Sequence, residues 1–137
     1  MSCDTTRRFG ELALYRLQML SRVTERLAEM QYRQAFGLTL LQARIIGVVG
    51  ESSALPFGQV VETLELEKAR ASRLIAGLIE RGLLEKPSGK RAVVIRLTPA
   101  GRQMWNSIYE AASGRNRKLL DCLYQTTLRC STGASHR

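Results

Sequence analysis

The fold is decided by residues 66–102, which read LEKARASRLIAGLIERGLLEKPSGKRAVVIRLTPAGR. Early in this stretch apolar residues recur at steps of three and four, the spacing of one face of an α-helix; they are Ala71, Leu74, Ile75 and Leu78. Gly82 follows, and glycine adopts at little cost the left-handed backbone that ends a helix. The pattern predicts a helix over residues 68–81 with one buried face.

The other face of this predicted helix is small and basic, and it follows a turn at residues 65–67. A helix fits the major groove of B-DNA, where each base pair shows a distinct pattern of donors and acceptors. The first residues after such a turn are the ones that reach base edges, and arginine can donate two hydrogen bonds to guanine. We predict DNA contacts from Lys68, Ala69, Arg70, Ser72 and Arg73.

A basic β-hairpin is expected directly after this helix. Residues 83–84 begin a strand, residues 87–90 (PSGK) form a turn, and the β-branched run 92–97 forms the return strand. A basic hairpin tip can lie in a minor groove, where narrow A·T tracts concentrate negative potential. We add Lys90 and Arg91 to the predicted DNA contacts. The alternative is that this basic turn is exposed to solvent and binds nothing.

Two shorter helices are expected before the basic helix. Thr39 is placed to cap the first of them, which closes at Gly50. Residues 51–55 are expected to form a loop, and Pro56 to stand in the first turn of the next helix. The order of short helix, turn, basic helix and basic hairpin is that of a winged helix-turn-helix.

Long helices are expected at both ends of the chain. Residues 5–36, ending before Gly37, carry an apolar stripe at Leu12, Tyr15, Met19, Val23, Leu27 and Met30. Such length favours a partner helix from a second subunit, and a helix folded onto its own core stays open as the alternative. The last helix is expected to start at Pro99, capped by Thr98, and to kink or divide at Gly114 and Asn116.

Positive charge is concentrated in one quarter of the chain. The net charge is +9, and residues 68–102 contain nine basic side chains and two acidic ones. Because like charges repel one another unless a polyanion binds them, this cluster points to nucleic acid. The first eight residues lack the apolar segment of a secretory signal, and no run of eighteen apolar residues occurs. We expect a cytoplasmic protein that does not bind membranes.

Side chains suited to catalysis or metal binding are sparse. Cys3, Cys122 and Cys130 form no C-x-x-C or Cys/His cluster, and His136 is the only histidine. We expect no enzymatic activity, no cofactor and no metal, although an enzyme built on carboxylates alone stays formally open. Cys3 or Cys122 could sense oxidants in an electropositive setting, but such cysteines are more often inert.

Together these pieces resemble the MarR family of winged-helix repressors, over roughly residues 10–123. The resemblance lies in Leu38-Thr39 opening a helix, in Leu66-Glu67-Lys68 leading into Ala71-Ser72-Arg73-Leu74, and in residues 78–84 (LIERGLL). The most specific part is the closing run 91–102 (RAVVIRLTPAGR), in which a strand is followed by L-T-x-x-G-R.

The resemblance implies a mainly α fold with a small β-hairpin (α+β). Residues 5–36 and 99–130 would be dimerisation helices, and residues 37–98 the winged helix-turn-helix DNA-binding domain. Independently of the resemblance, residues 131–137 (STGASHR) have nothing to bury and are expected to form a disordered tail. The resemblance also implies a homodimer that binds double-stranded DNA at a pseudo-palindromic operator, as a sequence-specific transcriptional regulator and repressor. The alternative is a winged-helix protein-interaction module without DNA binding.

A small-molecule effector is also implied, because an aromatic ligand or an oxidant would release the DNA in such a protein. Tyr15, Trp105 and Tyr109 are the candidates for lining a ligand pocket between the helical arms. Core packing is the commoner role of aromatic side chains and stays the alternative for each.

Two departures from the family pattern concern the wing. The family usually has an aspartate two residues before the wing arginine, and Gly89 stands there in this chain. The segment between Gly82 and Arg91 also looks a few residues shorter than usual. Both departures weaken the expectation that the wing inserts into DNA as in the family.

Overall fold

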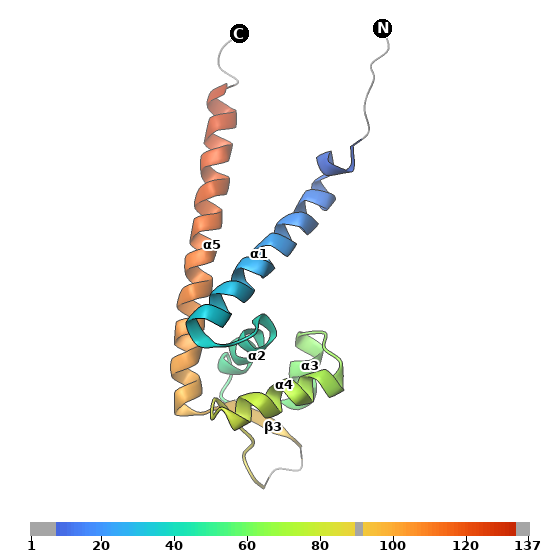
Figure 1. Cartoon of the computed structure of the whole chain (residues 1–137), viewed down its shortest axis with the longest axis vertical. Coiled ribbons are helices and arrows are strands. Elements are labelled where there is room, and N and C mark those ends of the chain that lie inside the picture. Colours follow the sequence, from blue (N-terminus) through green and yellow to red (C-terminus); the bar gives the residue numbers. More distant parts are fainter. Residues whose placement is uncertain (1–7, 90–91, 134–137) are drawn as a thin grey trace. The chain divides into compact units, whose positions relative to one another are not determined.

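The structure is a computed structural model that describes residues 8–89 and 92–133, with side chains up to residue 125. The chain divides into two units, residues 1–40 and 41–137. Helices make up most of both units, and the strands form one small antiparallel sheet (Figure 1). The predicted fold class, mainly α with a small β element, is confirmed.

The N-terminal unit is built on one long helix, α1 (Ala13–Phe36). A short 3-10 turn, η1 (Phe9–Glu11), precedes it. The α-helix therefore begins later than predicted, because Leu12 is extended with φ −72° and ψ 129°. Gly10 stands within the 3-10 turn, and a glycine loses more backbone entropy in a helix than any other residue. The predicted helix residues 5–7 lie outside the described part.

A glycine and a carboxylate fix the chain where α1 ends. Gly37 has φ 64°, as predicted for a helix stop, and its N–H donates to the carbonyl of Arg33 at 3.0 Å. The carboxylate of Glu29 accepts the backbone N–H of Leu40, the first residue of α2 (Leu40–Gly50), and the Nε of Arg33. The Leu40 N–H and then Arg33 hold the pKa of Glu29 below its ordinary value.

Three short strands form the sheet in the order β1-β3-β2. Both β1 (Leu55–Pro56) and β2 (Leu84–Glu85) pair antiparallel with β3 (Val94–Leu97). The predicted loop at residues 51–55 thus ends in a strand. Pro56 is in that strand and stands at the N-cap position of α3 (Phe57–Thr63), so it precedes the helix instead of standing in its first turn. An edge strand tolerates proline because its outer N–H needs no partner.

The core of the second unit lies among α2, α3, α4 (Lys68–Glu80) and the sheet (Figure 1). The predicted inward residues Ala71, Ile75 and Leu78 are buried, and Leu74 is half-buried. The largest buried side chains of the neighbouring elements are Ile45, Ile46, Val49, Val60, Leu84 and Ile95. Burial of one face of α4 in this core turns its opposite face to solvent.

The last helix, α5, is continuous from Pro99 to Gly133 (Figure 1). The predicted kink or division at Gly114 and Asn116 is wrong. A glycine costs a helix only about 1 kcal/mol relative to alanine, which a helix of 35 residues tolerates. The helix also extends into the tail predicted from residue 131, and residues 134–137 lie outside the described part.

The first turn of α5 is bound to the backbone that ends α4. Thr98 Oγ1 accepts the N–H of Gly101 at 3.0 Å, as the predicted cap, and its hydroxyl donates to the carbonyl of Gly82. The Thr98 N–H donates to the carbonyl of Leu83 at 3.1 Å. A Cβ added to Gly101 would stand 2.0 Å from that same carbonyl oxygen. Only glycine permits this approach.

We expect Gly101→Ala to destabilise the protein, because the new methyl group would collide with backbone that cannot rotate away. Overpacking of this kind costs typically about 1–3 kcal/mol, which should lower Tm by several degrees in thermal unfolding followed by circular dichroism. Gly114→Ala is the matched control, since an added Cβ there meets nothing within 4 Å, and it should raise stability slightly. Equal Tm values for Gly101→Ala and the wild type would contradict the close approach.

The contribution of Glu29 to stability should depend on pH. Because the pKa of folded Glu29 is lowered, its carboxylate stabilises the fold above the unfolded-state pKa, and this contribution disappears as pH falls through the folded-state pKa. Glu29→Gln should therefore lower Tm at neutral pH and match the wild type in acid below both pKa values. Glu110→Gln, which removes an exposed carboxylate from α5, is the control. A Tm difference that persists unchanged in acid would show that charge is not the cause.

Candidate nucleic-acid interface

The candidate interface is the exposed face of α4. With about 3.6 residues per turn, burial of Ala71, Ile75 and Leu78 directs the positions between them outward. The predicted residues on this helix are all exposed: Lys68, Ala69, Arg70, Ser72 and Arg73. Helical spacing places Arg73 near the centre of that face, with the small side chains of Ala69 and Ala76 on either side of it along the helix.

The charge of this face is not neutralised within the part of the chain that the structure describes. Lys68, Arg70 and Arg73 form no ion pair with any carboxylate of residues 8–89 and 92–125. The N-cap residue Glu67 makes no side-chain hydrogen bond to the helix end. The first N–H groups of α4 therefore remain open to an external acceptor, and a phosphate oxygen is such an acceptor.

The turn between α3 and α4 is compact and holds a residue in the left-handed region. Glu65 has φ 51°, a conformation that costs a non-glycine residue of the order of 1 kcal/mol. The N–H of Leu66 donates to the carbonyl of Val61 at 3.0 Å, and the N–H of Glu65 to that of Glu62 at 3.2 Å. These bonds tie the turn to the last turn of α3 and so set how α4 leaves it.

The wing consists of β2, β3 and the loop that joins them (Figure 1). Glu85 and Arg96 are cross-strand neighbours and form an ion pair with both side chains partly exposed, so one charge of the basic cluster is neutralised. Gly89 has φ 96°, a left-handed conformation that glycine adopts at little cost and that an aspartate would adopt here only with strain. The predicted tip residues Lys90 and Arg91 lie outside the described residues.

A pocket of about 500 Å³ lies between α2 and α5 within the second unit. Trp105 and Tyr109 line it, with their rings stacked at a centroid distance of 5.3 Å. Tyr15, the third predicted aromatic residue, is not among its lining residues; it lies on the N-terminal unit with its ring 6.5 Å from that of Phe9. The structure thus brings together two of the three residues.

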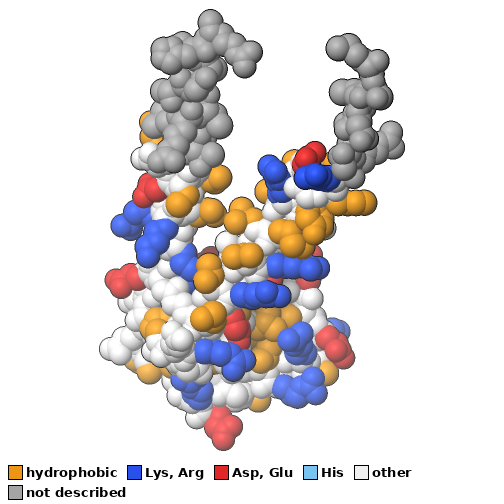
Figure 2. Space-filling view, turned by 45° about the horizontal axis from the view of Figure 1, so that its top comes forward, with side chains coloured by type: hydrophobic (Ala, Val, Ile, Leu, Met, Phe, Trp, Pro, Cys, Tyr) orange, Lys and Arg blue, Asp and Glu red, His pale blue; other side chains and the backbone are white. Residues whose placement is uncertain are grey.

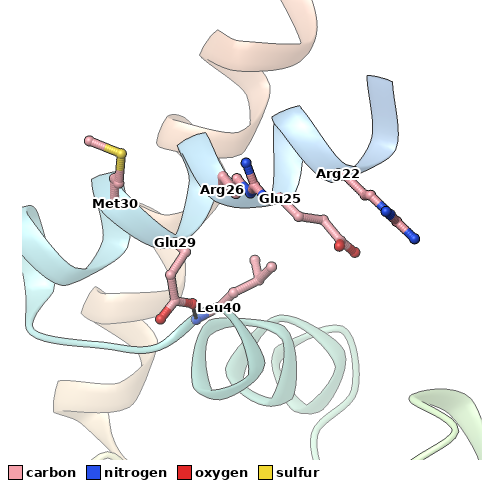
Figure 3. Close-up of a pocket in the computed structure, with 6 residues that line it drawn as sticks. All are labelled: Arg22, Glu25, Arg26, Glu29, Met30 and Leu40. Carbon is pink, nitrogen blue, oxygen red and sulfur yellow. Dashed lines mark hydrogen bonds between the residues drawn. The ribbon is translucent and has the colours of Figure 1, made fainter. Parts of the chain in front are cut away.

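A second pocket, of about 490 Å³, lies in the N-terminal unit and was not predicted (Figure 3). It is lined by Arg22, Glu25, Arg26, Glu29, Met30 and Leu40. Figure 3 shows the carboxylate of Glu29 directed at the backbone nitrogen of Leu40, so this acid is already engaged. Two arginines and two glutamates balance each other's charge. In the sequence these residues look like the ordinary charged face of an amphipathic helix.

Other chemistry is limited in the described residues. No group of three or more His, Cys, Asp or Glu side chains within them could hold a metal ion. None of their helices is both long and apolar enough to cross a membrane. Cys122 is exposed and is not part of a disulfide bond within the described residues, whereas Cys3 and the side chain of Cys130 lie outside the described part.

Known proteins provide an independent comparison. The family model of the MarR family matches residues 36–92, the segment from the end of α1 to the wing. A MarR/EmrR family transcriptional regulator from Acinetobacter sp. ADP1 is 24% identical, with a TM-score of 0.72, and the match covers 93% of this chain and 98% of that one. We find no match among curated protein sequences.

Two further solved structures share the fold. MepR, a transcription regulator of the Staphylococcus aureus multidrug efflux pump MepA, is 17% identical with a TM-score of 0.73, covering 90% of this chain and 97% of MepR. A mutant of MarR from E. coli, in complex with operator DNA, is 21% identical with a TM-score of 0.61, covering 76% and 77%. The resemblance to the MarR family is thereby confirmed, and the chain has the winged-helix fold of its transcriptional regulators.

Proposed function

We propose that this chain is a homodimeric, sequence-specific DNA-binding transcriptional regulator, and a repressor. The observation that carries the proposal is the exposed face of α4, which combines three cations without carboxylate partners, small side chains and open N–H groups at one helix end. The E. coli MarR mutant with the same fold was solved with operator DNA, which supports the same type of partner here. Operator sequence is read by α4 in the major groove.

Each residue of this face has a distinct proposed role. Arg73, near its centre, donates to a guanine, whose N7 and O6 accept a bidentate arginine. Lys68, Arg70 and Ser72 bind phosphates and fix the register of the helix on the duplex. Ala69 allows the helix backbone to approach the groove floor. Specificity would then depend mainly on Arg73, and affinity on the whole set.

The wing is proposed to contact the adjacent minor groove through Lys90 and Arg91. The turn at Gly89 precedes these two residues, and β2 and β3 pair on either side of the loop that contains them. Narrow A·T tracts attract such cations without a need for base-specific hydrogen bonds. The wing therefore adds affinity and a preference for flanking sequence.

The partner proposed for the exposed apolar helix surfaces is a second copy of this chain. Leu12, directly before α1, and the stripe residues Val23, Leu27 and Met30 on α1 are all more than half exposed. On α5, Leu120, Leu123 and Tyr124 are also more than half exposed. Figure 2 shows hydrophobic side chains open at the surface beside Lys and Arg side chains. A twofold dimer presents two copies of α4 to half-sites about 34 Å apart on a pseudo-palindromic operator.

Release of the DNA is proposed to follow from a small aromatic ligand in the pocket of Trp105 and Tyr109, or from oxidation of a cysteine. The pocket supports the first route, since its volume is in the range of small-molecule sites. The exposed thiol of Cys122 supports the second.

Arg73→Ala should weaken binding to the cognate operator by about 10-fold to 100-fold, because a bidentate contact to a base contributes about 1–3 kcal/mol. The operator is first selected from random DNA by the purified protein, and affinity is then measured by gel shift. Wild-type affinity should also fall by about 10³ or more between 50 and 200 mM salt.

Arg117→Ala is the control for this experiment. It removes the same charge and side chain from an exposed position on α5, many residues beyond the junction with α4, and should leave operator affinity nearly unchanged. Unaltered binding by Arg73→Ala would remove α4 from its assigned role. No affinity for any DNA at low salt would instead favour a protein-interaction module.

The double variant Leu120→Gln, Leu123→Gln should shift the protein from dimer towards monomer in sedimentation equilibrium. Both side chains are about half exposed, so their loss costs the isolated chain little, whereas a dimer that buries them loses about 1–3 kcal/mol for each. The control is Lys118→Gln with Asp121→Asn, two exposed polar positions on the same helix. A wild-type protein that is monomeric at tens of micromolar concentration would exclude the dimer.

A further inference from the structure

One line of side chains on α4 points directly away from the core. With about 3.6 residues per turn, the direction opposite the buried face of this helix is occupied by positions i, i+4, i+7 and i+11. All four positions are exposed, and they hold Ala69, Arg73, Ala76 and Glu80. Lys68, Arg70 and Ser72 lie to the sides of this outward line. Its residues would therefore be the first to meet the base edges of a major groove.

Two residues of the outward line are apolar, within a face that is otherwise charged or polar. Ala69 and Ala76 each present one methyl group to solvent, and neither contributes to the buried core. The major groove of B-DNA exposes one apolar group, the C5-methyl of thymine, and alanine is among the residues that contact it. Such a contact removes apolar surface from water on both sides. The two alanines are therefore suited to contact thymines.

The spacing of these residues along α4 matches that of neighbouring base pairs. At about 1.5 Å per residue, Ala69 lies about 6 Å and Ala76 about 4.5 Å from Arg73 along the helix axis. Residues about one turn apart on the helix of a zinc finger contact successive bases. The three residues would accordingly contact three successive base pairs, with the guanine of Arg73 in the middle pair and one alanine at each outer pair.

The last residue of the outward line limits the region that can meet DNA. Glu80 is an exposed carboxylate and forms no ion pair within residues 8–89 and 92–125. A phosphate close to it would be repelled, whereas the cations Lys68, Arg70 and Arg73 all lie on the N-terminal half of α4. The helix would therefore meet the groove with residues 68–76, and both alanines fall inside this region.

We propose that Ala69 and Ala76 are specificity-determining residues, which contact the methyl groups of two thymines. Each operator half-site then contains three successive base pairs, in which the guanine bound by Arg73 has an A·T pair on either side. A G·C pair at an outer position lacks the methyl group, so its apolar contact with alanine is lost. This inference rests on the proposed function and specifies the DNA sequence that α4 binds.

Deoxyuridine in place of thymine tests the contact directly, because it removes only the C5-methyl group and keeps the base pair. The operator selected from random DNA should show the predicted triplet in each half-site. Deoxyuridine at both outer pairs of one triplet should weaken binding in gel shift about 10-fold to 20-fold, which is about fourfold for each methyl group removed from an apolar contact. Equal affinity for the thymine and deoxyuridine operators would overturn the proposal. A preference for A·T pairs that does not depend on their methyl groups would show that groove shape is recognised instead, and would overturn it too.

Glycine variants assign each methyl contact to one alanine. Ala76→Gly should abolish the effect of deoxyuridine at one outer pair and keep it at the other, and Ala69→Gly should do the reverse. The measured quantity is the ratio of the two operator affinities, which partial unfolding of a variant does not change, because it lowers both affinities equally. Ala35→Gly, at an exposed position of α1, is the matched control and should keep both effects. Full sensitivity at both outer pairs in Ala69→Gly and Ala76→Gly would refute the assignment.

Two results separate this proposal from the proposed function. A protein that binds no DNA sequence selectively would refute the regulator, and this inference with it. A selected operator whose binding depends on Arg73 but not on thymine methyl groups would leave the regulator standing and refute the role of the two alanines.

Discussion

The contact between Thr98, Gly101 and the backbone that ends α4 is the constraint on which the winged-helix unit depends. This contact joins the backbone at residues 98–101 to the backbone at residues 82–83, and the Thr98 hydroxyl is the one side-chain group that takes part. Backbone contacts of this kind do not repack when side chains adapt, and Gly101 leaves no space between the two segments. A displacement of the first turn of α5 is therefore transmitted to Leu83 and so to the end of α4.

The next turns of α5 are attached to α2 in a similar way. Arg102 donates a hydrogen bond to the carbonyl of Gly50, and Trp105 donates one to the carbonyl of Gly47. Together with the contact of Gly101, these bonds attach the first two turns of α5 to the end of α2 and to the backbone that ends α4. In the proposed regulation, a ligand that packs on Trp105 acts on these same residues. The path from the pocket to α4 is then short and consists of hydrogen bonds and close packing within one unit, without any need for a change in the core.

Periodicity predicted the helices because their buried faces are regular, as Ala71, Ile75 and Leu78 show. It did not predict β1, since two residues contain no alternation and their pairing with β3 joins segments distant in sequence. The predicted kink or division of the last helix gave too much weight to Gly114 and Asn116, because the local cost of a glycine is small beside the cooperativity of a long helix. The five exposed residues of α4 were predictable because their exposure follows from the same periodicity.

The pocket was only half predictable. Trp105 and Tyr109 are conspicuous in the sequence. Glu51 and the glycines Gly47 and Gly50 line the same pocket only because α2 and α5 come together in space. Arg102 is a similar case. In the sequence it is one charge of a basic cluster, whereas in the structure its guanidinium donates a hydrogen bond to the carbonyl of Gly50 at the end of α2. At Gly89 the sequence shows only that the usual family aspartate is absent, whereas the structure shows a left-handed backbone angle at this position.

The two outer strands of the sheet have a consequence for behaviour at high protein concentration. β1 and β2 are each two residues long, β1 ends in Pro56, and Pro87 follows shortly after β2. A strand this short, interrupted by residues without an N–H, offers almost no template for an added strand from another molecule. The sheet can therefore remain small and open at both edges without promoting intermolecular β-aggregation, which leaves helix surfaces as the principal route to self-association.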